Sequence, residues 1–570
     1  MFQPNYLGLC EKLKFWKFKP NVPTELSQNL GLDSFSAQLL FNRKIETLKQ
    51  VEIFLNPNHD SLINPYDLPE MELAVERIKT ALENNESIGI FGDFDVDGIS
   101  ATAILLSTLN DFGISAFPYI PNRVSEGHGL NRKSLDYFKS KNVSLIITVD
   151  CGTTDLDEVS NAKSMGIDVI ITDHHLPLES RPNSAALINP NLPESNYSNK
   201  NLTGSGTAFK LATAIYNSFK KPIPNTLIQY AALGTISDVG ILNPENRFIV
   251  SEGITQMRNT QSIGLKALAE KSGTNLNTIT SQDAAFKLIP RLNAPGRLEN
   301  AIIALEILTT TNENTAHKVA IELESLNEKR KSMTSKSIFQ ARNQTKSNQL
   351  GIDIQEIIIV QHNDWHPGII GLIANQLSEQ FSKPAIAIAT NGKNSKGSAR
   401  SVVDFNIIEA LKECSDILTK FGGHSKAAGF TIDETFIPEL IKRLANTSNQ
   451  KHSSESKSKF EIECTTTVKE VINHFEFILS LEPFGPGNPT PIFLSQRMKV
   501  INAKTVGHTK DHLKMTLSDN EKYYDSIGFG LGNLIGQSNG YIDIIYQISE
   551  NTWNGMTNFQ LIIKDFVKSE

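Results

Sequence analysis

The sequence predicts an α/β protein with a doubly wound parallel sheet, followed by a second α/β domain and a small β-barrel. Three observations support this prediction. Between residues 88 and 188, short runs rich in β-branched residues alternate with stretches of helical periodicity, a pattern typical of parallel sheets. The same alternation returns near residue 356. The last hundred residues contain short strands without long helices, which suits a small barrel.

The expected elements follow in chain order. A helical segment comes first, interrupted by Pro57, Pro65 and Pro69. Strands are predicted at 88–91, 145–149, 169–172 and 185–188, and helices at 71–82, 99–109 and 156–165. A helix-rich region with a long helix from about Asn314 leads to a strand at 356–360. Residues 447–459, rich in Ser, Asn and Lys, are predicted to be a linker, and barrel strands are expected at 499–504, 512–517 and 541–548.

Length and composition limit the possible classes of protein. A chain of 570 residues is too long for one core, and we predict domains at 1–70, 71–240, 241–350, 351–447 and 460–570. No apolar stretch is long enough to span a bilayer, so no membrane association is expected. Residues 1–20 lack the apolar segment of a secretion signal. Four widely spaced cysteines fit a reducing compartment and exclude a cysteine zinc site, so we expect a cytoplasmic protein.

Positive charge is concentrated in two stretches, although the net charge is −7. Residues 329–346 carry six Lys or Arg and no acid, and residues 497–514 carry five against a single Asp511. Each stretch alone is equally compatible with a solvated surface. Together with a site for phosphate chemistry, they favour contact with nucleic acid.

Residues 93–98 place three carboxylates, Asp93, Asp95 and Asp97, at alternate positions after an apolar run. Side chains at i, i+2 and i+4 of a strand share one face, and three like charges held together at a strand end repel unless a cation lies among them. A calcium-binding EF-hand loop is excluded because its twelfth position is Ile104 and a strand precedes it. We therefore expect a divalent metal site, and a solvated acidic turn is the remaining alternative.

Further polar residues follow predicted strands. Asp150 ends one strand, Asp173-His174-His175 ends another, and Asp238 lies just past an apolar helix. Ligands gather at the carboxyl ends of parallel strands, so these residues are expected to converge. Taken singly, each is more often a helix cap or a surface histidine. A mixed Asp/His set favours Mn²⁺ with Mg²⁺ as the alternative, and its size suggests two ions that share a carboxylate and assist phosphoryl transfer.

These motifs resemble those of the DHH phosphoesterases, a family named after the triplet at 173–175. The resemblance continues through motifs at 120–130, 291–297, 366–371, 397–401, 421–425 and 482–489. Within the family, the full set is similar to the bacterial exonucleases that degrade single-stranded DNA from 5′ to 3′. The similarity covers nearly the whole chain beyond the first forty residues.

The resemblance implies roles for individual residues of the first domain. The metal ligands it implies are Asp95, Asp97, Asp150, His174 and Asp238. Asp150 would bridge two ions. Asp93 and His175 occupy positions of a further ligand or a neighbouring catalytic group, and His175 would steady the scissile phosphate or protonate the leaving oxygen.

The resemblance also implies a substrate-binding second domain and a C-terminal OB-type barrel. The expected substrate-binding residues are Arg297, His366, Ser398, Arg400, Gly422, Gly423 and His424. Arg297, Ser398 and Arg400 would grip a 5′-terminal phosphate. The glycines alternatively form only a tight turn, and His366 alternatively only caps a helix. In the barrel, Tyr523, Tyr524 and Phe529 would stack on bases or belong to the core.

The function implied is a manganese-dependent exonuclease that releases mononucleotides from the 5′ end of single-stranded DNA in recombination and repair. Single-stranded DNA is the expected partner, with a single-strand-binding protein and a helicase as further partners of a monomer. One alternative is a DHH phosphodiesterase acting on short oligoribonucleotides or cyclic dinucleotides, but such enzymes resemble only the first two domains. The other is a metal-free scaffold that binds single strands, in which the acidic positions would be eroded.

Overall fold

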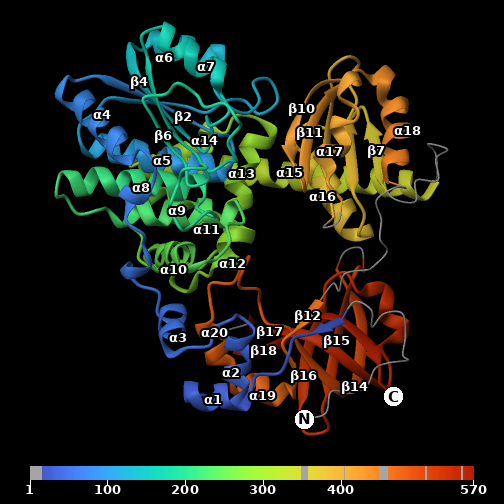
Figure 1. Cartoon of the computed structure of the whole chain (residues 1–570). Coiled ribbons are helices and arrows are strands. Elements are labelled where there is room, and N and C mark those ends of the chain that lie inside the picture. The colour runs from blue at the N-terminus through green and yellow to red at the C-terminus, as the bar shows by residue number, and fades with distance from the viewer. Residues whose placement is uncertain are drawn as a thin grey trace. The chain divides into compact units, whose positions relative to one another are not determined.

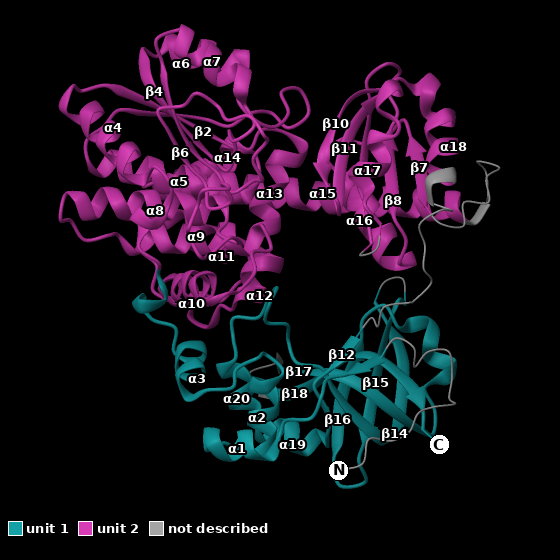
Figure 2. Cartoon of the chain, in the orientation of Figure 1, with its two compact units in different colours: residues 1–62, 455–570 teal, residues 63–454 magenta. Residues whose placement is uncertain are grey.

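The computed structural model describes residues 16–347, 357–402, 405–448, 460–507, 510–553 and 556–569. The chain divides into two compact units, one formed by residues 1–62 and 455–570 and the other by residues 63–454 (Figures 1 and 2). Residues 449–459 of the predicted linker lie outside the described residues. Among the helices that the structure describes, none is long and apolar enough to cross a membrane.

The first sheet of residues 63–454 is entirely parallel, with strand order β3-β2-β4-β5-β6. Its strands are β2 (Ser87–Gly92), β3 (Ala116–Tyr119), β4 (Val143–Val149), β5 (Asp168–Thr172) and β6 (Ala186–Ile188). Helices α6 (Arg132–Ser140) and α7 (Leu156–Ser164) cover one face, and α4 (Met71–Glu83), α5 (Val96–Asp111) and α8 (Gly204–Ser218) the other (Figure 1). The central strands are apolar on both faces because helices cover both. This arrangement confirms the doubly wound sheet predicted from the sequence.

Strand β3 is absent from the sequence prediction. It is a short strand at the edge of the sheet, and Pro118 occupies its third position. Proline cannot donate to a ladder and is tolerated in edge strands, so its presence argues locally against a strand. The omission matters because the loop that follows β3 contributes to the candidate active site.

A helical region joins the first sheet to the second. It contains α9 (Asn225–Ser237), α10 (Pro244–Arg258), α11 (Ile263–Ser272), α12 (Ser281–Asp283), a π-helical turn (Ala284–Leu288), α13 (Ile289–Leu298), α14 (Ile302–Thr309) and α15 (Glu313–Ser347). Helix α15 is 35 residues long and begins where the sequence predicted a long helix. It packs against α13 in the first half of the unit and against α16 (Ile370–Phe381) in the second.

The second sheet has the order β10-β11-β9-β8-β7. Its strands are β7 (Ile358–His362), β8 (Ala385–Ala389), β9 (Ser395–Arg400), β10 (Leu418–His424) and β11 (Ala427–Ile432). Only β7 and β8 are parallel to each other, and the remaining pairings are antiparallel. Helix α16 packs on one face with part of α15, whereas α17 (Ile407–Lys412) and α18 (Ile437–Ser448) cover the other.

The other unit is built around a closed β-barrel, as the sequence predicted. Its strands β14 (Phe493–Val506), β15 (His512–Ser518), β16 (Tyr523–Gly528), β18 (Met556–Lys568) and β17 (Tyr541–Trp553) pair in this order, and β14 pairs with β17 to close the ring. Strand β13 (Cys464–Thr465) and helices α19 (Val468–Asn473) and α20 (Phe475–Ser480) complete the C-terminal part. Tyr524 is buried in the barrel core, whereas Tyr523 is 73% exposed and Phe529 is exposed.

The N-terminal segment folds onto this barrel. It contains β1 (Trp16–Phe18), α1 (Thr24–Leu30), α2 (Ser34–Phe41) and α3 (Leu48–Leu55), and β1 pairs in parallel with β12 (Phe460–Ile462). Phe35, Leu39 and Leu40 of α2 are buried in the same apolar core as the barrel strands. No local pattern in the sequence indicated that the two ends of the chain share one core.

Candidate active site

The three alternating carboxylates do not lie on one face of a strand, which corrects the sequence prediction. Strand β2 ends at Gly92, and Asp95 is the N-cap of α5, where its side chain accepts hydrogen bonds from the backbone N–H groups of Asp97 (2.9 Å) and Gly98 (3.3 Å). Asp97 therefore lies in the first helical turn. The chain changes from strand to helix within the motif, so the two-residue period that we applied ends at Asp93.

Asp97 is fixed by the beginning of another helix. Its two carboxylate oxygens accept hydrogen bonds from the backbone N–H groups of Gly204 (2.7 Å) and Ser205 (2.9 Å), at the N-terminus of α8. A helix N-terminus stabilises negative charge through its unpaired N–H groups. A Cβ atom at Gly204 would lie 2.5 Å from the Asp150 side chain, and one at Gly234 only 2.4 Å from Asp97 Oδ1. Both glycines are therefore required by close packing around the carboxylates.

Asp150 follows β4 directly and has a left-handed backbone, with φ of 61°. A non-glycine residue adopts this conformation at a cost, and such residues are common at functional sites. His174 follows β5 and places its Nε2 3.1 Å from Asp150 Oδ1, 3.9 Å from Asp238 Oδ2 and 4.0 Å from Asp97 Oδ2. Asp238 lies at the C-terminus of α9, so it follows an apolar helix, as the sequence indicated, and not a strand.

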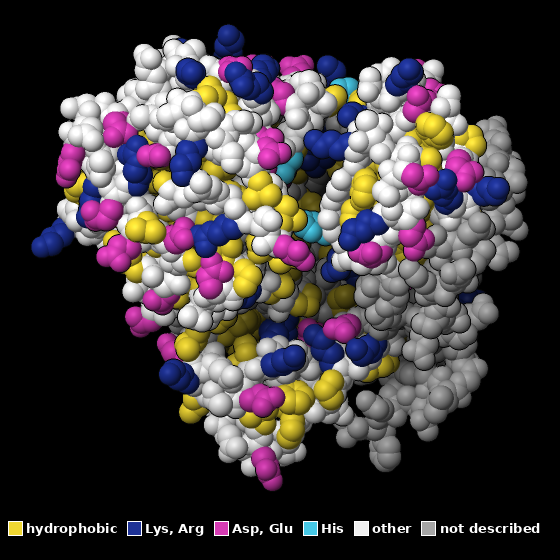
Figure 3. All heavy atoms as spheres, turned by 45° about the horizontal axis from the view of Figure 1, so that its top comes forward, with side chains coloured by type: hydrophobic (Ala, Val, Ile, Leu, Met, Phe, Trp, Pro, Cys, Tyr) yellow, Lys and Arg dark blue, Asp and Glu magenta, His cyan; other side chains and the backbone are white. Residues whose placement is uncertain are grey.

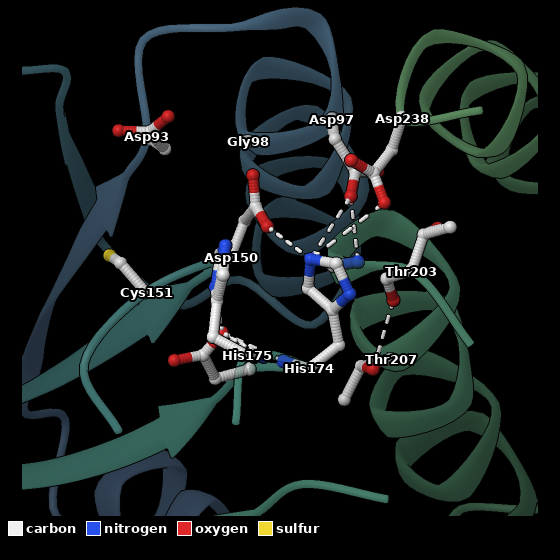
Figure 4. A network of polar contacts seen from close by, with 12 residues as sticks. Asp93, Asp97, Gly98, Asp150, Cys151, His174, His175, Thr203, Thr207 and Asp238 are labelled. Atoms are coloured by element: carbon white, nitrogen blue, oxygen red, sulfur yellow. Dashed lines mark hydrogen bonds and ion pairs between the residues drawn. The ribbon is translucent and has the colours of Figure 1, made fainter. Parts of the chain in front are cut away.

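The side chains converge as the sequence analysis expected. Three sets of atoms lie within 4.8 Å of one another: Asp150 with His174 and His175, Asp97 with His174 and Asp238, and Asp93 with Asp95 and Asp150. Figure 4 shows Asp97 and Asp238 side by side facing His174, with Asp93 apart from them beyond Asp150. Asp150 and His174 each belong to two sets, so the arrangement offers neighbouring positions that share ligands.

The electrostatics of this cluster fit a bound cation. Burial, and then the charges of Asp93 and Asp97, raise the pKa of Asp95 to about 6. Burial, followed by Asp97 and Asp95, raises the pKa of Asp238 to about 8, and the pKa of Asp150 is likewise raised well above its ordinary value. Buried carboxylates that repel one another resist ionisation, and a divalent cation would relieve this repulsion. Oxygen with imidazole nitrogen suits Mn²⁺, and carboxylates alone suit Mg²⁺.

His175 belongs to a separate pair with Asp173. Its Nδ1 lies 2.7 Å from Asp173 Oδ1, and Asp173 also accepts hydrogen bonds from three backbone N–H groups. Burial lowers the pKa of His175, but the hydrogen bond and the charge of Asp173 outweigh it and raise that pKa to about 9. The pair with Asp173 therefore favours the protonated form of His175, and its Nε2–H remains available to another acceptor.

Two residues near the site were missed in the sequence analysis, although both lie in the motif at 120–130. His128 Nδ1 lies 2.9 Å from Asp93 Oδ1, and its ring packs edge-on against His175 with centroids 5.4 Å apart. Arg123 lies 4.4 Å above the ring of Phe94. Recognising strand β3 would have placed this loop at the carboxyl edge of the sheet, where such side chains meet.

The second domain faces the site across a furrow, with histidine and basic side chains on its walls (Figure 3). The His424 ring lies parallel to His175 with centroids 6.4 Å apart. Gly422 and Gly423 precede it in the exposed edge strand β10, not in a tight turn. A Cβ atom at Gly422 would meet nothing within 4 Å, so this side of the strand is open.

A group of arginines lies beside the furrow. Ser398 and Arg400 alternate along β9, and an Arg400 Nη atom lies 3.3 Å from Ser398 Oγ. Burial, and then the guanidinium groups of Arg123 and Arg330, lower the pKa of Arg297 to about 9, and Arg400 also contributes. Among the described residues, no carboxylate forms an ion pair with Arg123, Arg297 or Arg400. This group is suited to an anion such as phosphate.

His366 does not cap a helix, which was the alternative to its expected role in substrate binding. Its Nδ1 accepts a hydrogen bond from the Gly368 N–H (3.1 Å), and the N-cap of α16 is Ile369. A Cβ atom at Gly368 would lie 1.8 Å from the carbonyl oxygen of Arg297. His366 thus shapes a turn that packs directly on the end of α13.

Comparison with known families agrees with this architecture. Residues 87–235 match the DHH family N-terminal domain, residues 354–450 the DHHA1 domain, and residues 462–565 the RecJ OB domain. Together with the parallel sheet and its Asp/His cluster, these matches define a protein of the DHH class.

Similarity to individual proteins narrows this class. The chain is 36% identical to the single-stranded-DNA-specific exonuclease RecJ of Bacillus subtilis, over 96% of this chain and 69% of that protein. The crystal structure of RecJ from Thermus thermophilus in complex with Mn²⁺ matches with a TM-score of 0.82 at 28% identity, covering 97% of this chain and 80% of that one. Its complex with Mg²⁺ matches at 26% identity with a TM-score of 0.78, covering 97% and 78%. The protein therefore belongs to the RecJ family.

Proposed function

We propose that the protein is a metal-dependent exonuclease that degrades single-stranded DNA from its 5′ end to mononucleotides, in recombination and repair. The observation that carries this proposal is the pairing of two unbalanced charge clusters in one unit. A buried group of acids around Asp150 and His174 lies near a group of arginines around Arg297. Asp95 is close enough to Arg297 for the two charges to interact. Such a site suits cations on one side and a phosphate on the other.

Asp95, Asp97, Asp150, His174 and Asp238 would hold two Mn²⁺ ions, with Mg²⁺ as the alternative, and Asp150 would be shared. When bound, such ions supply water activation and stabilise charge on the phosphate. The protein supplies the rest of the geometry. The α8 N–H groups orient Asp97, and His128 orients Asp93. Protonated His175 is placed to donate from Nε2 to a phosphate or leaving oxygen, because Asp173 holds its Nδ1.

Polarity would come from the arginine group. Ser398, Arg400 and Arg297, joined by Arg123, would bind the 5′-terminal phosphate and so fix the distance from the strand end to the cleaved bond. Guanidinium groups bind phosphate through paired hydrogen bonds, which suits this task better than an ammonium group does. His424, Gly422 and Gly423 would contact the adjacent nucleotide from the open strand β10, and His366 would support Arg297 from the turn before α16.

The barrel would bind the strand beyond the active site. Tyr523 and Phe529 are exposed and suited to stacking on bases, whereas Tyr524 is excluded because it is buried.

A single-strand-binding protein and a helicase remain proposed partners of a monomeric enzyme. The three described cysteines are free thiols, which supports the proposed cytoplasmic location. The RecJ OB match favours this function over a phosphodiesterase for short nucleotides, and the complete acid cluster favours it over a metal-free scaffold.

One assay tests the proposal. Strands of DNA and RNA labelled at either end are incubated with Mn²⁺, Mg²⁺ or a chelator, and the products are separated by length. We expect loss of mononucleotides from the 5′ end of DNA with Mn²⁺ and no reaction with chelator. Release from the 3′ end, or cleavage that persists after chelation, would contradict the assignment.

A further inference from the structure

One face of helix α15 carries polar groups without hydrogen-bond partners. Asn327, Arg330 and Thr334 are spaced i, i+3 and i+7, so their side chains share one side of the helix. Asn327 is fully buried, yet its Nδ2 has no partner in the described part of the chain. The same is true of Arg330 Nε and Thr334 Oγ1, which are also shielded from solvent.

The chemistry of these three groups indicates an anion. An amide nitrogen, a guanidinium nitrogen and a hydroxyl can all donate, and Arg330 Nη2 already donates to Asn327 Oδ1 at 2.9 Å. A buried donor left unpaired destabilises the protein, so three on one face call for a shared acceptor. The positive charge of Arg330 makes an anionic oxygen the best match.

The nearby carboxylates of the described residues are paired with other cations, although the charge of Glu328 also acts on Arg330. Neighbouring Arg291 forms an ion pair with Glu324, and Glu328 forms one with Lys331 at 2.8 Å. No ion pair joins Arg330 to any carboxylate of the described residues. Helix α15 packs on α13, and the charge of Arg330 acts directly on Arg297, the last arginine of that helix. Arg330 is therefore close enough to the arginine group for their charges to interact.

We propose that Arg330, Asn327 and Thr334 form a second phosphate subsite next to Arg297, which binds a phosphate of the strand other than the 5′-terminal one. This inference rests on the proposed function, because it takes Arg297 as part of the terminal pocket. The phosphate has two possible sources, which share the same chemistry. It is either a phosphodiester of the strand or an outer phosphate of a 5′-triphosphate end.

The test compares wild type with Arg330→Gln on oligonucleotides of one sequence that end in a 5′ hydroxyl, monophosphate or triphosphate. Binding is measured by fluorescence anisotropy in chelator, so that no hydrolysis occurs. Loss of one charge-assisted contact should weaken binding roughly ten- to a hundredfold. An equal loss on all three ends identifies a phosphodiester, and a loss confined to the triphosphate identifies an outer phosphate. Unchanged binding on every end overturns the subsite.

Two further variants distinguish a phosphate subsite from a general charge effect and from a buried water site. Lys318→Gln removes one positive charge from an exposed position on the same helix and should leave binding unchanged. Thr334→Val should weaken DNA binding several-fold without lowering the melting temperature of the free protein, because an unpaired hydroxyl is replaced by a methyl group. If the three groups only share buried water, Thr334→Val lowers the melting temperature and leaves binding unchanged, which also overturns the proposal. If wild type binds strands with a 5′ hydroxyl and a 5′ monophosphate equally well, this result would instead contradict the proposed pocket for the 5′-terminal phosphate.

Discussion

Helix α8 contacts two groups of buried charge, one at its N-terminus and one along its length, and the two groups differ in net charge. At its N-terminus, Gly204 and Ser205 hold Asp97 in a cluster dominated by carboxylates. Further along, Lys210 pairs with Glu245 at 2.8 Å, and both side chains are almost completely buried. The first group has excess negative charge, whereas the second has one charge of each sign.

The difference shows how one helix serves both function and stability. Glu245 also accepts hydrogen bonds from Tyr197, Asn199 and the Ile63 N–H, so its remaining lone pairs are satisfied within the protein. The acids around Asp150 have raised pKa values because they are buried and because their charges repel one another. In a closed network the buried charges neutralise one another, so removal of one partner is costly, whereas an unbalanced group provides a place for a ligand.

The strongest way to test this comparison is Asp150→Asn, which removes a negative charge while tolerating the left-handed backbone. Hydrolysis should fall by at least roughly a thousandfold, since water activation and charge stabilisation are both impaired. The metal-free variant should unfold no more easily than wild type, because repulsion is relieved. Rates of hydrolysis of end-labelled single strands measure the first effect, and unfolding by denaturant without metal measures the second.

Metal binding provides the control for this variant. Mn²⁺ should raise the melting temperature of the wild type by mass action and have a much smaller effect on Asp150→Asn. Retention of more than a tenth of the activity in the variant would mean that Asp150 is not at the centre of the site.

The opposite behaviour is expected of Lys210→Met. Removing one partner leaves the buried charge of Glu245 uncompensated, which should lower the free energy of unfolding by about 3–5 kcal/mol. The activity of the molecules that remain folded should be unchanged. Lys79→Met, which breaks an exposed ion pair with Glu76, should affect stability far less. A large loss of activity without loss of stability would show that the closed network also takes part in the chemistry.

Arg400→Ala examines the positive counterpart of the acid cluster. On strands with a 5′ phosphate it should cost roughly 1.5–3 kcal/mol in kcat/KM, the value of a charge-assisted hydrogen bond. On strands with a 5′ hydroxyl the loss should be much smaller. Because general misfolding depresses both substrates alike, equal losses would assign Arg400 to the fold or to strand binding in general.

The smallest effect is expected in the barrel. Two neighbouring uncharged residues, Tyr523 and Tyr524, allow a residue that contacts the ligand to be compared with one that stabilises the fold. Tyr523→Ala should weaken binding of single strands by about 1 kcal/mol, because one stacking surface is lost. Tyr524→Ala should instead destabilise the barrel, since Tyr524 is a core residue. Deletion of the barrel is a poorer test because it would expose the apolar residues of α2. Weaker binding of single strands by fluorescence anisotropy, with an unchanged unfolding curve, would identify Tyr523 as a contact with the strand. Unchanged affinity would exclude Tyr523 from the interface.

Local pattern was enough to predict much of the site. Asp150 and Asp173 follow apolar runs that could be recognised as parallel strands, so their positions at one sheet edge were predictable. Ser398 and Arg400 were expected to act with Arg297 because of the family resemblance, not because of local pattern. The spacing of Asp93, Asp95 and Asp97 misled the strand-face argument, because capping by Asp95 starts a helix inside the motif.

Contacts between distant segments set the rest. The N–H groups that hold Asp97 lie more than a hundred residues away in sequence, and the residue types at 204–205 do not indicate that role. Arg123 and His128 depend on an edge strand that Pro118 conceals. The unpaired groups of α15 look like ordinary polar positions of a long helix until their surroundings are known.

The core shared by the two ends of the chain has a consequence for how the protein is made. Residues 63–454 form a continuous body that can fold as it leaves the ribosome, whereas α2 must wait for strands synthesised more than 400 residues later. Ion pairs such as Lys17–Glu461 span the same interval. A newly synthesised chain therefore presents Phe35, Leu39 and Leu40 without their core for most of translation, the interval in which chaperones act.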